Sequence, residues 1–301
     1  MDARTPGNGR GTDRRAPGDL PTEAEVLGRT GGENFPVALR ILPGDLRRDL
    51  LALYGFARFT DQLGDAYRGD RLAALDWLET ELDRALGGVA DVHPLVRRMA
   101  VTVAARHLDP VPLHNLIEAN RVDQRVAAYD TFDDLVGYCR LSADPVGRLV
   151  LGIFGHADVQ RILWSDAVCT ALQLAEHWGD VTEDAAAGRV YLPAADLRRF
   201  DVDPAELTAP GPARPALRAL MAFEVDRARR LLDRGAPLPG SLRGWARVAT
   251  TAFVGGGYAA LDALAAAGYD PLGGTPPRRA LRMATETAAV WRSRRGRGAG
   301  T

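Results

Sequence analysis

Helix-forming residues at helical spacing dominate the chain from residue 33 to residue 292. Leu, Ala and Arg recur at intervals of three and four, and no long run of β-branched residues occurs. These residues lose little side-chain freedom in a helix, whereas strands are rich in β-branched side chains. Clusters of Gly and Pro interrupt the pattern and divide it into about nine or ten helices. The sequence therefore predicts one all-α domain over residues 33–292.

The two ends of the chain have a different composition. Residues 1–32 are rich in Gly, Arg, Pro and Asp, and residues 293–301 consist mainly of Gly and Arg. Segments with so few apolar residues cannot bury enough surface to offset the entropy lost on ordering. Both ends are predicted to be disordered tails.

Composition also bears on the cellular compartment and on partners. Cys139 and Cys169 are the only cysteines, so no disulfide framework is available and a reducing cytoplasm is expected. The longest uncharged apolar stretch, Val248 to Leu261, is shorter than the roughly 20 residues of a membrane span. No signal peptide is expected, and any membrane contact should be peripheral, at the inner face. The net charge of −1 argues against a nucleic-acid partner.

Two aspartates four residues apart, Asp61 and Asp65, form the first candidate site. Counting from Leu50 by the helical period places Leu53, Ala57 and both aspartates on one side of a helix. The prediction is that both carboxylates continue a buried stripe, where bare charges are costly and repel each other. Mg²⁺, which takes one or two carboxylates and completes its shell with water and phosphate oxygens, would relieve that cost. The alternative is a helix that leaves the core after Ala57, with both carboxylates in solvent.

A second pair, Asp180 and Asp184, repeats the spacing, with Glu183 between its members. On a continuous helix this pair shares a polar face, opposite an apolar face that consists of Leu163, Ala171, Leu174, Trp178 and Val181. Taken alone, this is the pattern of a surface helix. Two acidic pairs that face each other across a helical bundle would hold Mg²⁺ over a diphosphate. Arg189 is then a candidate phosphate clamp, Tyr191 a wall or donor, and the adjoining His177 a neighbour of the pair.

Five motifs in order resemble those of the squalene/phytoene synthase family, and in particular its bacterial hydroxysqualene synthase branch of hopanoid biosynthesis. They are ENFPVALRILP (33–43), YGFARFTDQLGD (54–65), YCRLSADPVGRLVL (138–151), GDVTEDAAAGRVYLP (179–193) and GYDPL (268–272). The resemblance covers residues 33–292. It implies an all-α isoprenoid-synthase bundle with a central active-site cavity.

The resemblance also implies roles for individual residues. Asp61, Asp65, Asp180 and Asp184 would be the catalytic, magnesium and diphosphate positions, and Tyr138 would be a catalytic residue that lines the cavity. The implied substrate-binding residues are Asn34, Phe35, Arg40, Tyr54, Arg58, Glu183, Arg189 and Tyr191.

Three positions depart from the family pattern. Gln62 replaces an acid that is often found in the first motif, Glu176 stands where the family often has Asn, and Gly179 stands where condensing members usually carry Arg. The missing Arg favours a member that acts on preformed presqualene diphosphate.

The resulting hypothesis is a Mg²⁺-dependent enzyme that converts presqualene diphosphate and water to hydroxysqualene and diphosphate, without NADPH. One alternative is a head-to-head condensing prenyltransferase that joins farnesyl or geranylgeranyl diphosphates. Another is a non-catalytic helical homologue that scaffolds a lipid pathway. The expected partners are a prenyl diphosphate, presqualene or farnesyl, and other enzymes of the hopanoid pathway.

Overall fold

A computed structural model describes residues 16–18, 20–28 and 42–273. This part of the chain is helical apart from loops and one isolated bridge between Ala128 and Val190, so the prediction of an all-α fold is confirmed. The helices of ten or more residues are α3 (Gly44–Asp61), α4 (Arg71–Leu86), α5 (Pro94–Arg106), α6 (Val111–Asp123), α7 (Phe132–Ser142), α8 (Asp144–Ile153), α9 (Val159–Gly179), α12 (Pro215–Gly235) and α14 (Gly244–Ala266). The shorter ones are α1 (Glu23–Gly28), α10 (Val181–Ala186), α11 (Ala194–Arg199) and α13 (Leu238–Ser241).

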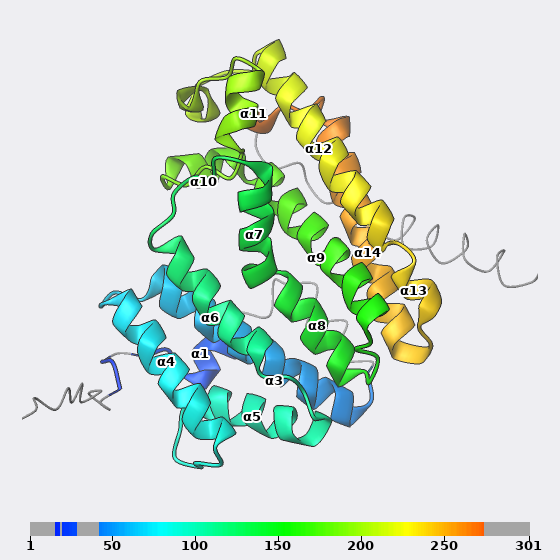
Figure 1. Cartoon of the computed structure of the whole chain (residues 1–301). Coiled ribbons are helices and arrows are strands. Elements are labelled where there is room, and N and C mark those ends of the chain that lie inside the picture. The colour runs from blue at the N-terminus through cyan, green and yellow to red at the C-terminus, as the bar shows by residue number, and fades with distance from the viewer. Residues whose placement is uncertain (1–15, 19, 29–41, 274–301) are drawn as a thin grey trace, which may run out of the picture.

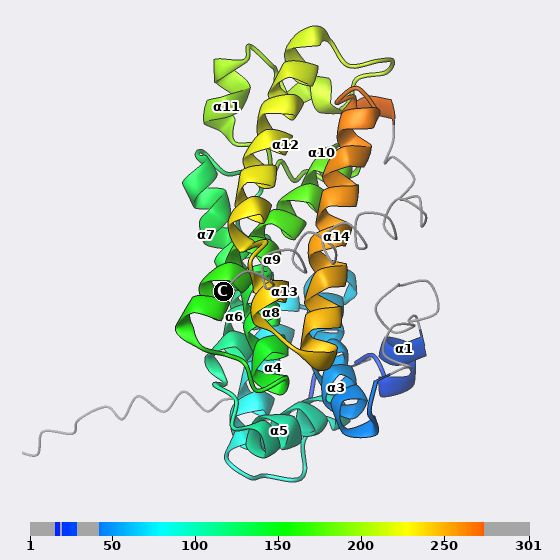
Figure 2. The same cartoon turned by 90° about the vertical axis from the view of Figure 1, so that its right-hand side faces the viewer.

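The long helices surround two large apolar cores, and a smaller apolar cluster lies where α8, α13 and the start of α14 meet. One core lies among α3, α4, α5, α6 and α8, and the other lies among α7, α9, α12 and α14. Figure 1 shows these groups in the lower and upper parts of the molecule, and Figure 2 shows α12 and α14 running alongside each other. Because α8 packs against both α9 and α3, it joins the two groups.

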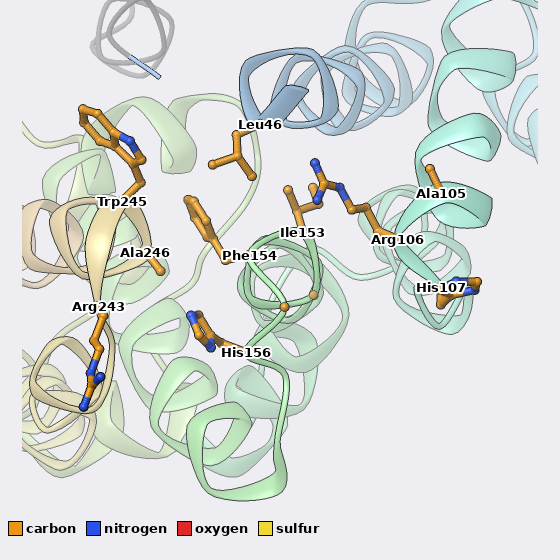
Figure 3. A pocket seen from close by; sticks show the side chains of 12 residues that line it. Leu46, Ala105, Arg106, His107, Ile153, Phe154, His156, Arg243, Trp245 and Ala246 are labelled. Carbon is orange, nitrogen blue, oxygen red and sulfur yellow. The ribbon is translucent and has the colours of Figure 1, made fainter. Parts of the chain in front are cut away.

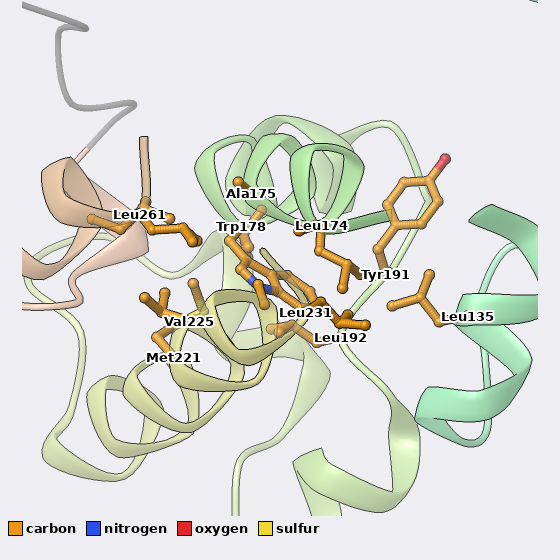
Figure 4. Packing of buried hydrophobic residues seen from close by; sticks show 14 of the residues in the cluster. Leu135, Leu174, Ala175, Trp178, Tyr191, Leu192, Met221, Val225, Leu231 and Leu261 are labelled. Carbon is orange, nitrogen blue, oxygen red and sulfur yellow. The ribbon is translucent and has the colours of Figure 1, made fainter. Parts of the chain in front are cut away.

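The second core is built on the contact between α9 and α12. Trp178 of α9 is fully buried, and its indole nitrogen donates to the Glu224 carbonyl at 3.3 Å. Figure 4 shows Trp178 among Leu174, Val225 and Leu231. A Cβ on Gly235 would lie 2.6 Å from the Trp164 carbonyl oxygen, so the close approach of the two helices requires glycine there. This packing holds the C-terminal end of α9, which leads directly into the second acidic motif.

One expectation for an individual segment needs correction. The expected tail of residues 1–32 contains α1, because Val26 is fully buried against the first core and anchors it. The rest of both expected tails lies largely outside the described residues. Within the described residues, one helix, α14, has the length and hydropathy of a membrane span, although no span was expected. It packs against α9 and α12, and 44% of its most apolar window is buried.

The free energy of unfolding should depend on pH through Glu224. This side chain is fully buried, 3.3 Å from Arg227, and burial raises its pKa to about 8. Because the folded-state pKa exceeds the unfolded one, this group's stabilisation is complete below about pH 4.5 and is lost as the pH rises to about 8. Between pH 5 and pH 8.5, the free energy of unfolding measured with urea should therefore fall by roughly 3 kcal/mol more for the wild type than for Glu224→Gln. Parallel pH curves for the two proteins would contradict this assignment.

Candidate active site

The first acidic pair lies where α3 ends. Asp61 is the last residue of α3, and Asp65 lies in the π-helical turn Gln62–Ala66 that follows. Both side chains are exposed, so the predicted placement on a buried stripe is wrong. The buried face is rotated relative to the predicted one and consists mainly of Leu50, Ala52, Leu53, Phe56, Phe59, Thr60 and Leu63. The pair therefore lies at the edge of the core, where solvent and ligands reach it.

Asp61 is accessible to solvent, yet neighbouring protein atoms perturb it strongly. Loss of solvation raises the pKa of its carboxyl to about 6, and the charge of Asp65 adds to this effect. The Asn120 side chain of α6 donates to Asp61 at 3.4 Å and offsets part of the shift. A Cβ on Gly64 would lie 2.0 Å from the Asn120 side-chain oxygen, so glycine allows this approach of α6. The site thus holds a carboxylate whose charge is poorly compensated by the protein.

The second acidic pair does not lie on one continuous helix. The chain leaves helical geometry at Asp180 (φ −109°, ψ 18°), so α9 ends before it and α10 begins after it. The expectation of one continuous helix was therefore wrong. Ala171, Leu174, Trp178 and Val181 of the predicted apolar face are buried as expected, whereas Leu163 is 58% exposed. Asp184 lies on α10, with its carboxylate 3.6 Å from Nδ1 of His177. Glu183, on the same short helix, is exposed.

An ion pair connects the two acidic motifs. Arg189, which follows α10, donates from Nη2 to Oδ1 of Asp65 at 3.0 Å, across 124 positions of sequence. The same guanidinium acts electrostatically on Tyr191, whose pKa is raised to about 12, mainly by burial and also by nearby carboxylates that include Asp123 and Asp184. The structure therefore brings Asp65, Arg189, Tyr191 and Asp184 into one neighbourhood.

Aromatic side chains form the wall beside this neighbourhood. Tyr191 stacks on Tyr129 with centroids 6.0 Å apart, and Tyr138 lies 5.5 Å from Tyr129 and 6.0 Å from Tyr191. Figure 4 shows Tyr191 at the edge of the second core, with its hydroxyl directed away from the apolar side chains. Three electron-rich faces thus lie close to the acidic motifs.

Asp123, at the end of α6, is a site residue that the sequence did not reveal. The Tyr138 hydroxyl donates to its Oδ2 at 2.9 Å, whereas its Oδ1 is buried without a hydrogen-bond partner among the described residues. Burial raises the pKa of its carboxyl, and Asp65, Arg189 and His177 all act on it electrostatically. Its only sequence signal was the helical spacing with Asn120, which belongs to no recognisable motif.

The remaining predicted residues are placed in part. Tyr54 and Arg58 lie on α3, two turns and one turn before Asp61, and the charge of Arg58 favours ionised Asp61. Asn34, Phe35 and Arg40 lie outside the described residues. The C-terminal motif adjoins the second acidic motif, since Thr182 donates to the Pro271 carbonyl at 3.0 Å.

The acidic pairs fit a divalent cation only in combination with a ligand. No group of three Asp, Glu, His or Cys side chains among the described residues is arranged to hold a metal ion. Accessible carboxylates in pairs are nevertheless the donors that Mg²⁺ uses together with waters and phosphates. The raised pKa of Asp61 indicates that the protein compensates its negative charge poorly, and a bound cation would compensate it. The Oδ1 atom of Asp123 lacks a hydrogen-bond partner among the described residues, and a bound group could supply one.

A separate cavity of about 410 Å³ lies at the far end of α3. Figure 3 shows it between Leu46, Phe154, Trp245 and Arg243. Leu46 precedes Asp61 by fifteen residues, which corresponds to about 22 Å along the helix. This cavity is therefore remote from the acidic pairs.

Comparison with known proteins places the chain among isoprenoid enzymes. Residues 29–285 match the family model of squalene/phytoene synthase. The hydroxysqualene synthase of Zymomonas mobilis is 37% identical over 56% of this chain and 60% of the relative, so the match spans less than two thirds of that protein. The phytoene synthase of Mycobacterium tuberculosis is 33% identical over 68% of each chain. The crystal structure of squalene synthase HpnC from Alicyclobacillus acidocaldarius has a TM-score of 0.76 and 46% identity, over 81% of this chain and 92% of that one.

Proposed function

The chain belongs to the squalene/phytoene synthase family, and from this premise we propose that it is a hydroxysqualene synthase. The proposed reaction converts presqualene diphosphate and water into hydroxysqualene and diphosphate. The observation that carries the proposal is the ion pair between Asp65 of the first acidic motif and Arg189, which follows the second acidic pair. The resemblance to hydroxysqualene synthases and Gly179, in place of the Arg of condensing members, support the choice of reaction.

The proposed metal ligands are Asp61, Asp65, Asp180 and Asp184. Bound Mg²⁺ would neutralise the charge that accumulates on the departing diphosphate. Arg189 has a complementary role, because its planar guanidinium matches phosphate oxygens. As the diphosphate enters, Arg189 exchanges its Asp65 partner for a phosphate oxygen. Arg58, one turn before Asp61, adds a second positive charge on the same side.

The aromatic wall would shelter the carbocation that remains after the carbon–oxygen bond breaks. Both electrons of that bond leave with the diphosphate, so a positive charge remains on the hydrocarbon. The faces of Tyr129 and Tyr138 would each stabilise a cation by about 1–2 kcal/mol in a desolvated site. Tyr191, which stacks on His177 and Tyr129, supports this wall. Burial raises the pKa of Tyr138 well above its usual value, so its hydroxyl stays protonated and keeps its hydrogen bond to Asp123.

Asp123 would direct the water that captures this cation. Its unpaired Oδ1 is positioned to accept a hydrogen bond from that water, and its raised pKa makes it a stronger base than an ordinary carboxylate. As the water oxygen bonds to carbon, its proton passes to Oδ1. The alcohol is then neutral, and no reductant is consumed.

Two alternatives stay open. The phytoene synthase and squalene synthase relatives favour a condensing enzyme that joins two prenyl diphosphates. A non-catalytic homologue that scaffolds a lipid pathway is the other, and the exposed, closely grouped acidic and basic side chains argue against it.

Isotope labelling separates the three functions. Purified protein with presqualene diphosphate and Mg²⁺ in ¹⁸O water, without NADPH, should yield hydroxysqualene that carries the heavy oxygen, because water captures the cation. Mass spectrometry of the extracted alcohol measures this. In a parallel reaction with farnesyl diphosphate as the only prenyl substrate, consumption of that substrate would show the condensing function. Failure to consume either substrate would favour the scaffold.

A further inference from the structure

His177 occupies a central position beneath the second acidic pair. It lies in the last turn of α9, is 7% exposed, and stacks face to face on Tyr191 with centroids 3.6 Å apart and an angle of 15°. The two ring nitrogens face different partners. Nδ1 is 3.6 Å from Oδ2 of Asp184, and Nε2 is 3.1 Å from the side-chain nitrogen of Gln173. One side chain thus contacts a proposed metal ligand and a wall of the proposed substrate site.

The partner at Nε2 determines where the ring proton lies. In this orientation of the Gln173 amide, the side-chain nitrogen faces Nε2 of His177 and donates a hydrogen bond to it. In the neutral ring the proton is therefore on Nδ1, the nitrogen that faces Asp184. The 3.6 Å separation is just beyond hydrogen-bonding distance, so a small movement of Asp184 brings its carboxylate within reach. Such contacts commonly tighten when ligand binds.

We propose that His177 is a positioning residue that holds Asp184 through Nδ1 and Tyr191 through its ring, with Gln173 setting its tautomer. The inference rests on the proposed function, since it assigns Asp184 to a metal–diphosphate site. A hydrogen bond to a ligand carboxylate fixes its orientation, and loss of such a partner typically weakens metal binding about 10- to 100-fold. A histidine that merely fills the core would leave metal binding unchanged.

Two variants distinguish the contribution of the His177 ring from that of the proton on Nδ1. His177→Phe keeps an aromatic face against Tyr191 and removes the Nδ1 donor. His177→Asn loses the ring but places an amide nitrogen close to the position of Nδ1. His114→Phe is the matched control, because His114 also lies close to two carboxylates, 3.5 Å from Glu79 and 3.4 Å from Asp83. It lies in the first turn of α6, whereas Asp123 of the proposed site lies at the other end of that helix.

A binding measurement tests the proposal without turnover. Mn²⁺ is added in the presence of inorganic pyrophosphate, and the electron paramagnetic resonance signal measures the free Mn²⁺ that remains. His177→Phe should bind at least about tenfold more weakly than the wild type, with His177→Asn recovering part of the loss and His114→Phe unchanged. The Mg²⁺ concentration for half-maximal activity should rise in parallel, while kcat at saturating Mg²⁺ changes far less. Thermal unfolding of each variant verifies that the fold is kept.

The outcomes distinguish this inference from the function on which it rests. If the wild type and His177→Phe bind Mn²⁺ with pyrophosphate equally well, the role of His177 is overturned and the proposed function is not. Equal impairment of His177→Phe and His177→Asn would overturn the role of the Nδ1 proton. If the wild type itself binds no Mn²⁺ with pyrophosphate, the proposed function fails, and the inference fails with it.

Discussion

Replacing Asp61 with asparagine should lower turnover of a prenyl diphosphate by at least about a thousandfold, which corresponds to about 4 kcal/mol of transition-state stabilisation. The amide keeps the size of the side chain and still accepts the hydrogen bond from Asn120. What it loses is the negative charge that the proposed site uses to hold a divalent cation. Steady-state release of diphosphate from presqualene diphosphate, at saturating Mg²⁺, measures the effect.

The same substitution should not cost stability. Because the pKa of Asp61 is raised to about 6 in the folded protein, the charge that the carboxyl carries above that pH lowers the free energy of unfolding, and the uncharged amide avoids this cost. The thermal midpoint of Asp61→Asn at pH 8 should therefore equal or exceed that of the wild type. Asp91→Asn, at an exposed loop position, is the matched control and should leave both activity and stability unchanged. An Asp61→Asn variant with more than a tenth of wild-type activity would refute the assignment.

Replacing Asp123 with asparagine should lower formation of the alcohol by about a hundredfold or more, within the range that a general base contributes. The amide can still accept the hydrogen bond from Tyr138, but it cannot take a proton from water. The effect should be larger on water capture than on ionisation. Diphosphate release should therefore fall less than the yield of ¹⁸O-labelled hydroxysqualene, and other hydrocarbon products should appear.

Comparing two product channels makes this prediction specific. Diphosphate release and labelled alcohol are quantified in the same reaction mixture for the wild type, Asp123→Asn and Asp133→Asn. Asp133 is an exposed carboxylate in the first turn of α7, the helix that also carries Tyr138, and its replacement should change neither channel. Proportional loss of both channels in Asp123→Asn would show that Asp123 acts before the water step.

The fold could be predicted from the sequence because its determinants are local. Helix-forming residues at helical spacing and clusters of Gly and Pro marked the long helices. The break at Asp180 was missed because the apolar spacing continues through Trp178 and Val181, although Gly179 immediately before it is a signal for a helix end. The α1 helix was missed because Val26 is a single apolar anchor whose partners lie far away in sequence.

The site was predictable only where it follows motifs. The spacing of the acidic pairs and the basic and aromatic residues that follow the second pair singled out side chains that the structure brings together. Asp123 and the tautomer of His177 were not accessible in this way, because each depends on contacts between helices that spacing along one helix cannot express. The exposure of Asp61 and Asp65 was missed for a related reason. The side of α3 that packs is decided by α5, α6 and α8, and the predicted stripe lies at the edge of that surface.

The central claim is that both acidic pairs hold one diphosphate through divalent cations. Crystals grown with Mn²⁺ and inorganic pyrophosphate test it directly, since anomalous scattering locates the metal independently of the protein atoms. We expect anomalous peaks in contact with Asp61 or Asp65 and with Asp180 or Asp184, bridged by pyrophosphate that also contacts Arg189. Pyrophosphate bound elsewhere, or Mn²⁺ absent from either pair, would contradict it.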